Sequence, residues 1–260
     1  MRTSRRTVAF VALSLLALQS VVPLTGVMAS AEGEPRESPP ADLQPPGAQA
    51  RLLAALRTKI PIDSVELKGD PYMVWHAKEP PRAPADTVCG VRFEPDQVRY
   101  RLSTFPNTVA ARTAGFAVTH FGACGTCSTL QDLSVYLGKR DLTVPVRSCG
   151  IRWDASARLK CLEHLGFSTA CAQTWLYDVQ NTRRQCFSVC LWSWIKDEPP
   201  TQKDGRLNAC LQCDEDRSGP VFKATAGRTR RNSGIHSSIP RPDDEIAPVV
   251  HDYVPDLAPK

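Results

Sequence analysis

Two cysteines and a histidine lie close enough in the sequence to do chemistry together. His120 ends an apolar run, and Cys124 and Cys127 follow it as C-G-T-C, directly before an amphipathic stretch. A thiolate attacks carbonyl carbons and disulfides, and a nearby histidine can serve as its general base. The spacing predicts a cysteine-centred site at these three residues. The alternative for His120 is a residue at the end of a strand whose ring bonds to the backbone.

The segment from 117 to 137 resembles thioredoxin in its order of strand, C-x-x-C and helix. In that arrangement the first thiol lies at a helix N-terminus, where the dipole favours the thiolate, and the second thiol resolves the mixed disulfide. The resemblance implies that Cys124 attacks and Cys127 resolves. It covers about 20 residues, and the nearest proline that could match the cis-proline of thioredoxin, Pro145, follows the motif too soon.

The letters GACGTCS also resemble the start of papain-like proteases, in which the second cysteine opens a helix and is the nucleophile. This resemblance implies Cys127 as nucleophile and Cys124 as a half-cystine, with His236 or His251 as the base and Asp252 orienting it. The chain departs from that pattern after the second cysteine, where a serine replaces the usual tryptophan, and before the motif, where a phenylalanine replaces the oxyanion-hole glutamine.

Two further interpretations give the CGTC cysteines no reactivity. They can be half-cystines with separate distant partners, because ten cysteines behind a secretory leader are typical of a disulfide framework. They can also join Cys210 and Cys213 in a four-thiolate zinc site, although these pairs lie far apart in the sequence. The C-x-x-C spacing alone leaves redox, nucleophilic, structural and metal interpretations open.

An arginine cluster near the C-terminus predicts anion binding. Arg228, Arg230 and Arg231 lie in GRTRRNSG, and guanidinium groups bind carboxylate, sulfate or phosphate through paired N–H donors. The expected partner is an anionic small molecule, glycan or protein. One alternative is a surface on which these arginines pair with the acidic residues 214–216. Another is a processing site at RTRR.

The stretch DEDRSG matches the opening of a calcium loop. Asp214, Asp216 and Ser218 occupy the first, third and fifth positions, and Gly219 the sixth, but Thr225 stands where the loop needs a closing glutamate. This predicts at most a weak calcium site. The alternative is an acidic segment that complements a helix dipole. The expected cofactor set is therefore none, with calcium as the weak candidate.

The N-terminus predicts export. Residues 1–31 carry three arginines, an apolar stretch and the small residues of A-S-A, typical of a signal peptide cleaved after Ala31, with a retained anchor as the alternative. Residues 32–48 are rich in proline and predict a flexible stalk. The expected location is extracellular or periplasmic, without stable membrane insertion after cleavage.

The charge balance excludes a nucleic-acid partner. Removing the three leader arginines leaves 29 of the 32 basic residues against 27 acidic residues. A net charge of +2 gives no broad basic surface for a phosphate backbone.

The elements expected to position these residues form a single disulfide-rich α+β domain from 49 to 260. Alternating stretches predict strands over 87–93 and 97–105, and the apolar stretch 113–121 predicts a buried strand. Helices are expected over the following residues: 48–60, 155–165 behind an Asp154 cap, a long segment from Ser168 or Thr169 to 195 with a break near Asn181, and one capped by Ser218. The C-terminal half is thus mostly helical, with an extended tail from about 235.

Three stretches, THFGACGTCSTLQDL, CDEDRSGP and GRTRRNSG, are similar to an uncharacterised family of secreted, cysteine-rich proteins. That resemblance implies one structural unit and no particular activity. The sequence as a whole predicts a secreted, disulfide-stabilised protein with a cysteine-centred site at CGTC beside an anion-binding arginine segment. The alternative is a non-catalytic binding or structural module with five structural disulfides, so enzyme activity is left open.

Overall fold

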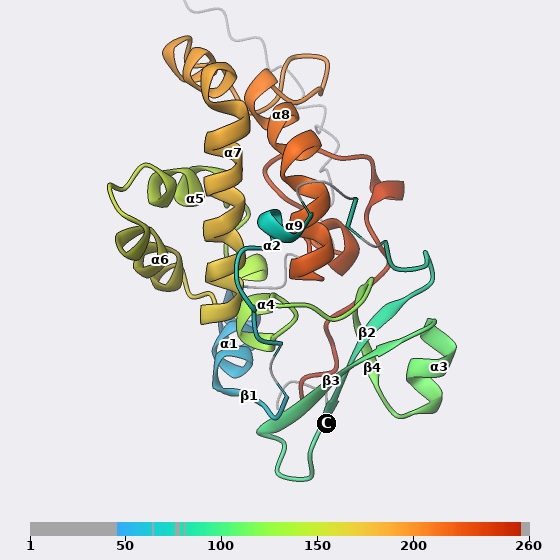
Figure 1. The fold of residues 1–260 in the computed structure, drawn as a ribbon. Helices are drawn as coiled ribbons and strands as arrows, with labels where there is room; N and C mark the ends of the chain where they lie inside the picture. Colours follow the sequence, from blue (N-terminus) through green and yellow to red (C-terminus); the bar gives the residue numbers. More distant parts are fainter. Residues whose placement is uncertain (1–45, 64, 76–78, 81, 256–260) are drawn as a thin grey trace, which may run out of the picture. The chain divides into compact units, whose positions relative to one another are not determined.

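The computed structural model describes residues 46–63, 65–75, 79–80 and 82–255 (Figure 1). The expected leader and nearly all of the expected stalk lie outside these residues. The described elements form one α+β domain in which a small sheet is joined to a larger helical part, as the sequence predicts. No helix among the described residues is long and apolar enough to cross a membrane.

The sheet has four strands in the order β1-β3-β2-β4. The strands are β1 (Ile60–Pro61), β2 (Val88–Phe93), β3 (Arg99–Phe105) and β4 (Ala117–Phe121). β2 runs antiparallel to both β3 and β4, and its Cys89 lies opposite His120 of β4. This register brings β2 beside the chain that leaves β4 and enters the CGTC turn.

The helices account for most of the chain after the sheet. They are α1 (Pro46–Thr58), α2 (Pro71–Trp75), α3 (Thr108–Thr113), α4 (Leu130–Gly138), α5 (Thr143–Gly150), α6 (Ala155–His164), α7 (Thr169–Ile195), α8 (Ala209–Arg217) and α9 (Gly219–Ala226). The predicted caps Asp154 and Ser168 accept hydrogen bonds from Ala157 N–H and Cys171 N–H. These caps are confirmed, because each satisfies a first-turn donor that has no partner inside its helix.

Helix α7 continues through the predicted break near Asn181. Asn181 sends its side chain across to the α8–α9 junction, where Nδ2 donates to Arg217 O at 3.3 Å and Ser218 Oγ at 3.1 Å. Because its amide bonds to a neighbouring helix, it does not compete with the backbone of its own helix. The break was therefore a wrong prediction.

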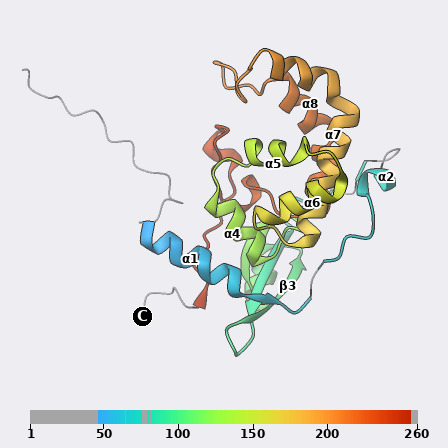
Figure 2. The same cartoon turned by 90° about the vertical axis from the view of Figure 1, so that its left-hand side faces the viewer.

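The core lies where the sheet meets α1, α4, α6 and α7 (Figures 1 and 2). Leu56, Tyr100, Leu130 and Leu133 are fully buried there. All ten cysteines form disulfides, which are Cys89–Cys124, Cys127–Cys171, Cys149–Cys161, Cys186–Cys213 and Cys190–Cys210. The predicted disulfide-rich domain is confirmed.

Candidate functional site

The two CGTC sulfurs are joined to different distant partners. Cys124 bonds to Cys89 of β2, and Cys127 bonds to Cys171 in the first turn of α7. This pairing leaves neither a free thiolate nor a Cys124–Cys127 redox disulfide, so it corrects the predicted catalytic roles of both cysteines. The structure agrees with the interpretation in which both cysteines are half-cystines with separate distant partners.

The zinc alternative fails for the same reason. Cys210 and Cys213 are bonded to Cys190 and Cys186, and an oxidised sulfur has no thiolate to offer a metal.

The backbone of the turn is clamped by the C-terminal end of α9. Thr126 N–H donates to Thr225 O at 3.0 Å, and Cys127 N–H donates to Ala226 O at 2.9 Å. Gly125 permits this approach, because a Cβ at this position would lie 2.4 Å from Thr225 O. Two N–H groups that could have faced a substrate thus satisfy the last carbonyls of a helix.

His120 is fully buried and neutral. Its Nδ1–H donates to Phe121 O at 2.9 Å, so Nε2 is the acceptor and takes the O–H of Ser128 at 2.8 Å. Burial, and then the charge of Arg228, hold the pKa of His120 well below its usual range. Ser128 has the hydrogen bond of an activated nucleophile but is also fully buried. The prediction of His120 as a base beside the cysteines is corrected, because its ring orients the turn through Ser128 and bonds to the backbone.

Arg228 is the largest fully buried side chain of the described part of the chain. All five of its N–H groups have acceptors. Nε donates to Cys127 O at 3.2 Å, Nη1 to Thr119 O at 3.0 Å and Ser233 Oγ at 3.3 Å, and Nη2 to Thr119 Oγ1 at 2.7 Å and Ser128 O at 3.1 Å. The guanidinium therefore ties β4, the CGTC turn and the C-terminal segment together, and has no donor left for an external anion.

A directional chain of hydrogen bonds continues from this guanidinium into the C-terminal segment. Because Thr119 Oγ1 accepts from Arg228, its own proton goes to Tyr253 Oη at 2.8 Å, and Tyr253 O–H in turn donates to His251 Nδ1 at 2.9 Å. His251 Nε2–H closes the chain on Ser233 O at 2.8 Å. Burial and the nearby Arg228 lower the pKa of His251 to about 3.

This lowered pKa predicts a loss of stability in mild acid. A group whose folded-state pKa is depressed stabilises the fold above its unfolded pKa, about 6.5 for histidine, and loses that stabilisation as the pH falls towards the folded value. Between pH 7 and pH 5 we expect His251 to remove about 1–2 kcal/mol from the free energy of unfolding. His251→Gln keeps one donor and one acceptor but does not titrate, so denaturant unfolding should show a flatter pH profile. Equal slopes for both proteins would contradict this expectation.

The other two predicted anion-binding arginines also bond within the fold. Arg230 Nη1 donates to Tyr136 O at 2.7 Å, and Nη2 donates to Lys139 O, so this side chain caps the C-terminal end of α4. Arg231 pairs with Glu245 at 3.0 Å and with Glu215 at 3.9 Å. The three guanidinium groups bond to different parts of the fold and do not converge, so the predicted anion site is corrected. For Arg231, the structure shows the alternative that the sequence offered, pairing with acidic residues.

The calcium-loop residues lie on and after a helix. Asp214 and Asp216 belong to α8, whose 100° rotation per residue points them in nearly opposite directions. Asp214 accepts from Thr182 Oγ1, Asp216 accepts from Gln212 Nε2 at 2.9 Å, and Ser218 Oγ bonds to Thr182 at 2.7 Å. This arrangement corrects the calcium-loop prediction, and no cluster of three or more metal-binding side chains occurs among the described residues.

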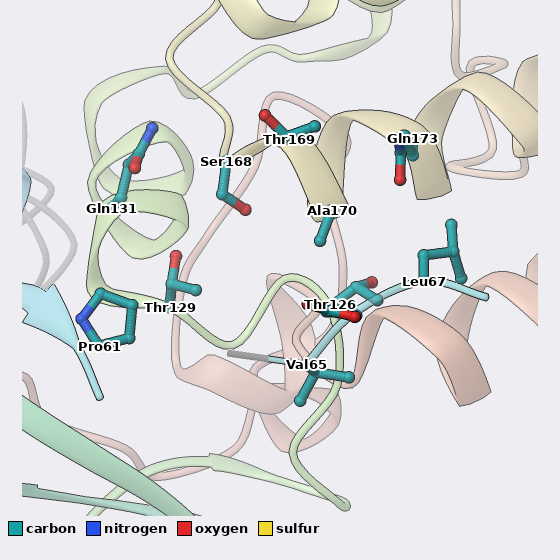
Figure 3. Close-up of a pocket in the computed structure, with 11 residues that line it drawn as sticks. Pro61, Val65, Leu67, Thr126, Thr129, Gln131, Ser168, Thr169, Ala170 and Gln173 are labelled. Atoms are coloured by element: carbon teal, nitrogen blue, oxygen red, sulfur yellow. The ribbon is translucent and has the colours of Figure 1, made fainter. Parts of the chain in front are cut away.

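A cleft of about 400 Å³ lies on the side of the CGTC turn that faces α7 (Figure 3). It is lined by Pro61, Val65, Glu66, Leu67, Thr126, Thr129, Gln131, Ser168, Thr169, Ala170 and Gln173. Figure 3 shows Pro61, Val65 and Leu67 on one side and the first turn of α7 on the other. Hydroxyl and amide groups dominate the polar part of this lining.

The first turn of α7, two of whose residues line this cleft, has unused backbone donors. Cys171 N–H is satisfied by Ser168 Oγ and Ala172 N–H by Ser168 O. Within the described ranges, Thr169 N–H and Ala170 N–H have no acceptor. Since the first N–H groups of a helix point out of its end and carry the positive side of its dipole, they favour an oxygen of a bound molecule.

Asp132 fixes the wall of the cleft and was not singled out from the sequence. Its carboxylate accepts from Ser168 N–H and Ser168 Oγ, each at 2.8 Å, and from Thr129 Oγ1 at 2.5 Å. It is fully buried, and burial raises its pKa to about 6 despite these donors. The T-L-Q-D spacing, similar to a capping box, is the signal that could have revealed it.

Comparison with known proteins assigns no activity to these residues. No curated protein and no solved structure matches the chain. Residues 155–249, which run from α6 into the C-terminal segment that carries Arg228, match a family of unknown function (DUF8771). Over these residues the chain is similar to a family whose function is uncharacterised, in agreement with the resemblance expected from its sequence.

Proposed function

We propose that the protein is a secreted, disulfide-stabilised binding module that holds a small, uncharged polar ligand in the cleft beside the CGTC turn. The main support is the pair of unused N–H donors of Thr169 and Ala170, two residues that line a cleft of about 400 Å³. Five disulfides support export, because such bonds persist in oxidising compartments. Thiol catalysis would first require reduction of Cys89–Cys124 or Cys127–Cys171.

The lining indicates the chemistry of the ligand. Among the described residues that line it, Glu66 is the one ionisable side chain, so an anion would meet a negative charge and none of these residues would balance it with a cation. A carbonyl or hydroxyl oxygen instead suits the first turn of α7, while Pro61, Val65 and Leu67 offer contact to an apolar group. The volume lies near the lower end of the range for small-molecule sites. A blocked amino acid or a short peptide segment combines these properties.

Replacing one backbone donor tests this proposal. Thr169→Pro removes the N–H at the first position of α7, where proline is well tolerated. The preceding residue, Ser168, has φ −61° and ψ 154°, a conformation that a following proline accepts. Thr169→Ala is the matched control, because it removes the side-chain hydroxyl and keeps the N–H.

The probes are N-acetyl-leucinamide and N-acetyl-leucine, titrated against the labelled protein by two-dimensional NMR. We expect saturable shifts with the amide around residues 126–131 and 168–173, unchanged affinity in Thr169→Ala, and about fivefold weaker binding in Thr169→Pro, as loss of one hydrogen bond gives. Absence of saturable shifts in wild type, or equal binding by both variants, would contradict the proposal. Stronger binding of the carboxylate would contradict the preference for an uncharged ligand.

A further inference from the structure

Asp178 of α7 is a buried carboxyl group with a single hydrogen-bonding partner. The residue is 6% exposed, and its Oδ1 lies 2.7 Å from Tyr72 Oη. No other side-chain hydrogen bond and no ion pair joins Asp178 to the residues that the structure describes. A buried carboxylate is stable only beside a cation or several donors, because the interior does not replace the water that solvates its charge. One phenolic O–H does not meet this requirement, so Asp178 is expected to be neutral.

The ionisable groups around Asp178 do not supply the missing cation. Three elements packed against α7 contribute these groups, which are Asp214 and Glu215 of α8, Lys223 of α9 and Tyr72 of α2. Lys223 Nζ lies 2.8 Å from Glu215 Oε2, so this cation is already paired with another acid. Burial, and then the negative charge of Asp214, raise the pKa of Asp178 well above its usual range.

Asp214 has the donors that Asp178 lacks. Thr182 O–H donates to Asp214 Oδ1, so Thr182 Oγ1 accepts the proton of Ser218 Oγ, 2.7 Å away. Ser218 Oγ in turn accepts from Asn181 Nδ2 at 3.1 Å. This chain of donors ends on the carboxylate of Asp214. Of the two neighbouring acids, Asp214 therefore keeps the negative charge and Asp178 keeps the proton.

Tyr72 fixes α2, which Figure 1 shows between α7 and α9, to α7 and to the start of α9. Its Oη lies 2.7 Å from Asp178 Oδ1 and 3.1 Å from Ser218 O, and burial raises the pKa of its hydroxyl, which therefore keeps its single proton. When Asp178 O–H donates to Tyr72 Oη, that proton can bond to Ser218 O. When Asp178 is ionised, the same proton must face the carboxylate, and the bond to Ser218 O is lost. The ion pair of Asp70 with Arg184, at 3.7 Å, involves a half-exposed arginine and adds little.

One wall of the cleft beside the CGTC turn leads directly into α2. Residues 65–67 line that cleft. Ile62 N–H donates to Tyr100 O at 2.9 Å, and among the described residues that follow, 63 and 65–69 make no backbone–backbone hydrogen bond to another element. The position of this wall therefore depends on where α2 is held.

We propose that Asp178 carries a proton in the folded protein at neutral pH, and that this proton holds α2, and with it the 65–67 wall of the cleft, in the closed position. The proton is released when α2 opens, because the carboxylate regains water only when Tyr72 leaves it. Opening therefore becomes more frequent as the pH rises, which makes access to the cleft sensitive to pH. The role in ligand access rests on the function proposed above, whereas the retention of α2 does not.

The direction of this pH dependence follows from the raised pKa of Asp178. The proton stabilises the closed form fully below the usual pKa of an aspartate, and this stabilisation is lost as the pH rises towards the folded-state value. Between these two values, opening increases by up to about tenfold per pH unit, as release of one proton gives. Asp178→Asn keeps the shape of the side chain but does not titrate, so its opening should not share this dependence.

Two measurements without ligand test this inference on the intact, disulfide-bonded protein. Amide exchange of Tyr72 and Met73, divided by the intrinsic rate, reports the opening of α2, and the rate of tryptic cleavage after Lys68 reports the wall. Between about pH 6 and about pH 9, we expect the ratio of wild type to Asp178→Asn to rise at least about tenfold for each rate. Asp96→Asn changes an exposed aspartate between β2 and β3, and this matched control should keep the wild-type dependence.

NMR of the carboxyl carbons gives the protonation state of Asp178 directly, with Asp178→Asn assigning its resonance. We expect the chemical shift of a protonated acid at neutral pH. Asp214→Asn removes the neighbouring negative charge and lowers the pKa of Asp178, so the rise of both rates with pH should become smaller.

Two results would overturn the proposal. One is the chemical shift of an ionised carboxylate for Asp178 at neutral pH. The other is a ratio of wild type to Asp178→Asn that stays constant with pH for either rate. Because neither measurement contains a ligand, these failures are distinct from a failure of the cleft to bind N-acetyl-leucinamide.

Discussion

Replacing Arg228 with methionine is expected to destabilise the domain strongly. The substitution keeps much of the side-chain length but leaves the Thr119, Cys127 and Ser128 carbonyls and two hydroxyls without their donor, all in a region closed to water. Removing one member of a buried, hydrogen-bonded charged network costs about 3–5 kcal/mol. Urea unfolding of the purified variant, with disulfides intact, measures this loss.

Two control variants separate charge from geometry. Arg228→Lys keeps the charge, but its three N–H donors lie on one nitrogen and cannot reach acceptors on all sides. We therefore expect the free energy of unfolding to fall nearly as much as in Arg228→Met. Arg230→Met removes a half-buried arginine whose hydrogen bonds are only partly buried, and we expect a smaller loss, about 1 kcal/mol. If Arg228→Met unfolds at the same urea concentration as wild type, the role assigned to the guanidinium is wrong.

Replacing Gly125 with alanine is expected to displace the CGTC turn from α9. The new methyl would lie 2.4 Å from Thr225 O and 2.6 Å from Ala226 C, and both contacts are backbone atoms that no side-chain rotation can relieve. Overpacking of this kind costs about 1–3 kcal/mol, and separation of the turn also breaks the hydrogen bonds of Thr126 and Cys127 N–H. We expect a total loss of about 3 kcal/mol or more, seen as a lower midpoint of thermal unfolding.

Gly47 provides the matched control for this substitution. A methyl at Gly47 meets no atom within 4 Å, and the residue lies within α1. Gly47→Ala should therefore leave stability unchanged or raise it by about 0.5–1 kcal/mol, because alanine is the better helix former. Similar melting of the Gly125 and Gly47 variants would show that the close approach of the turn to α9 is not a constraint.

Local features of the fold could be predicted from the sequence because they depend on neighbouring residues. The Asp154 and Ser168 caps, the alternation of 87–93 and 97–105, and the start of α9 after Ser218 are encoded within a few positions. The predicted cap at Ser218 is wrong, because its side chain accepts no hydrogen bond from the first turn of α9. Ten cysteines likewise predicted a disulfide framework. The pairing could not be predicted, because Cys89 approaches Cys124 only through the register of β2 against β4.

The candidate site could not be predicted correctly from the sequence, because the predicted site residues make contacts between segments that lie far apart in the sequence. In a sequence, RTRR is typical of a solvent-exposed charged segment, yet the end of α9 directs Arg228 into the space between β4 and the CGTC turn. DEDRSG has the composition of a loop, but the Asn208 cap and contacts with Thr182 place its acidic residues on α8. The cleft depends on Asp132, whose capping of α7 spans 36 residues of sequence.

Peptide mapping of the native, unreduced protein by mass spectrometry tests most directly whether the CGTC cysteines are structural. We predict peptides that join Cys89 to Cys124 and Cys127 to Cys171, and no thiol that reacts with an alkylating reagent after denaturation without reductant. A peptide with Cys124 bonded to Cys127, or a free thiol at either position, would contradict the account and return the motif to redox or nucleophilic chemistry.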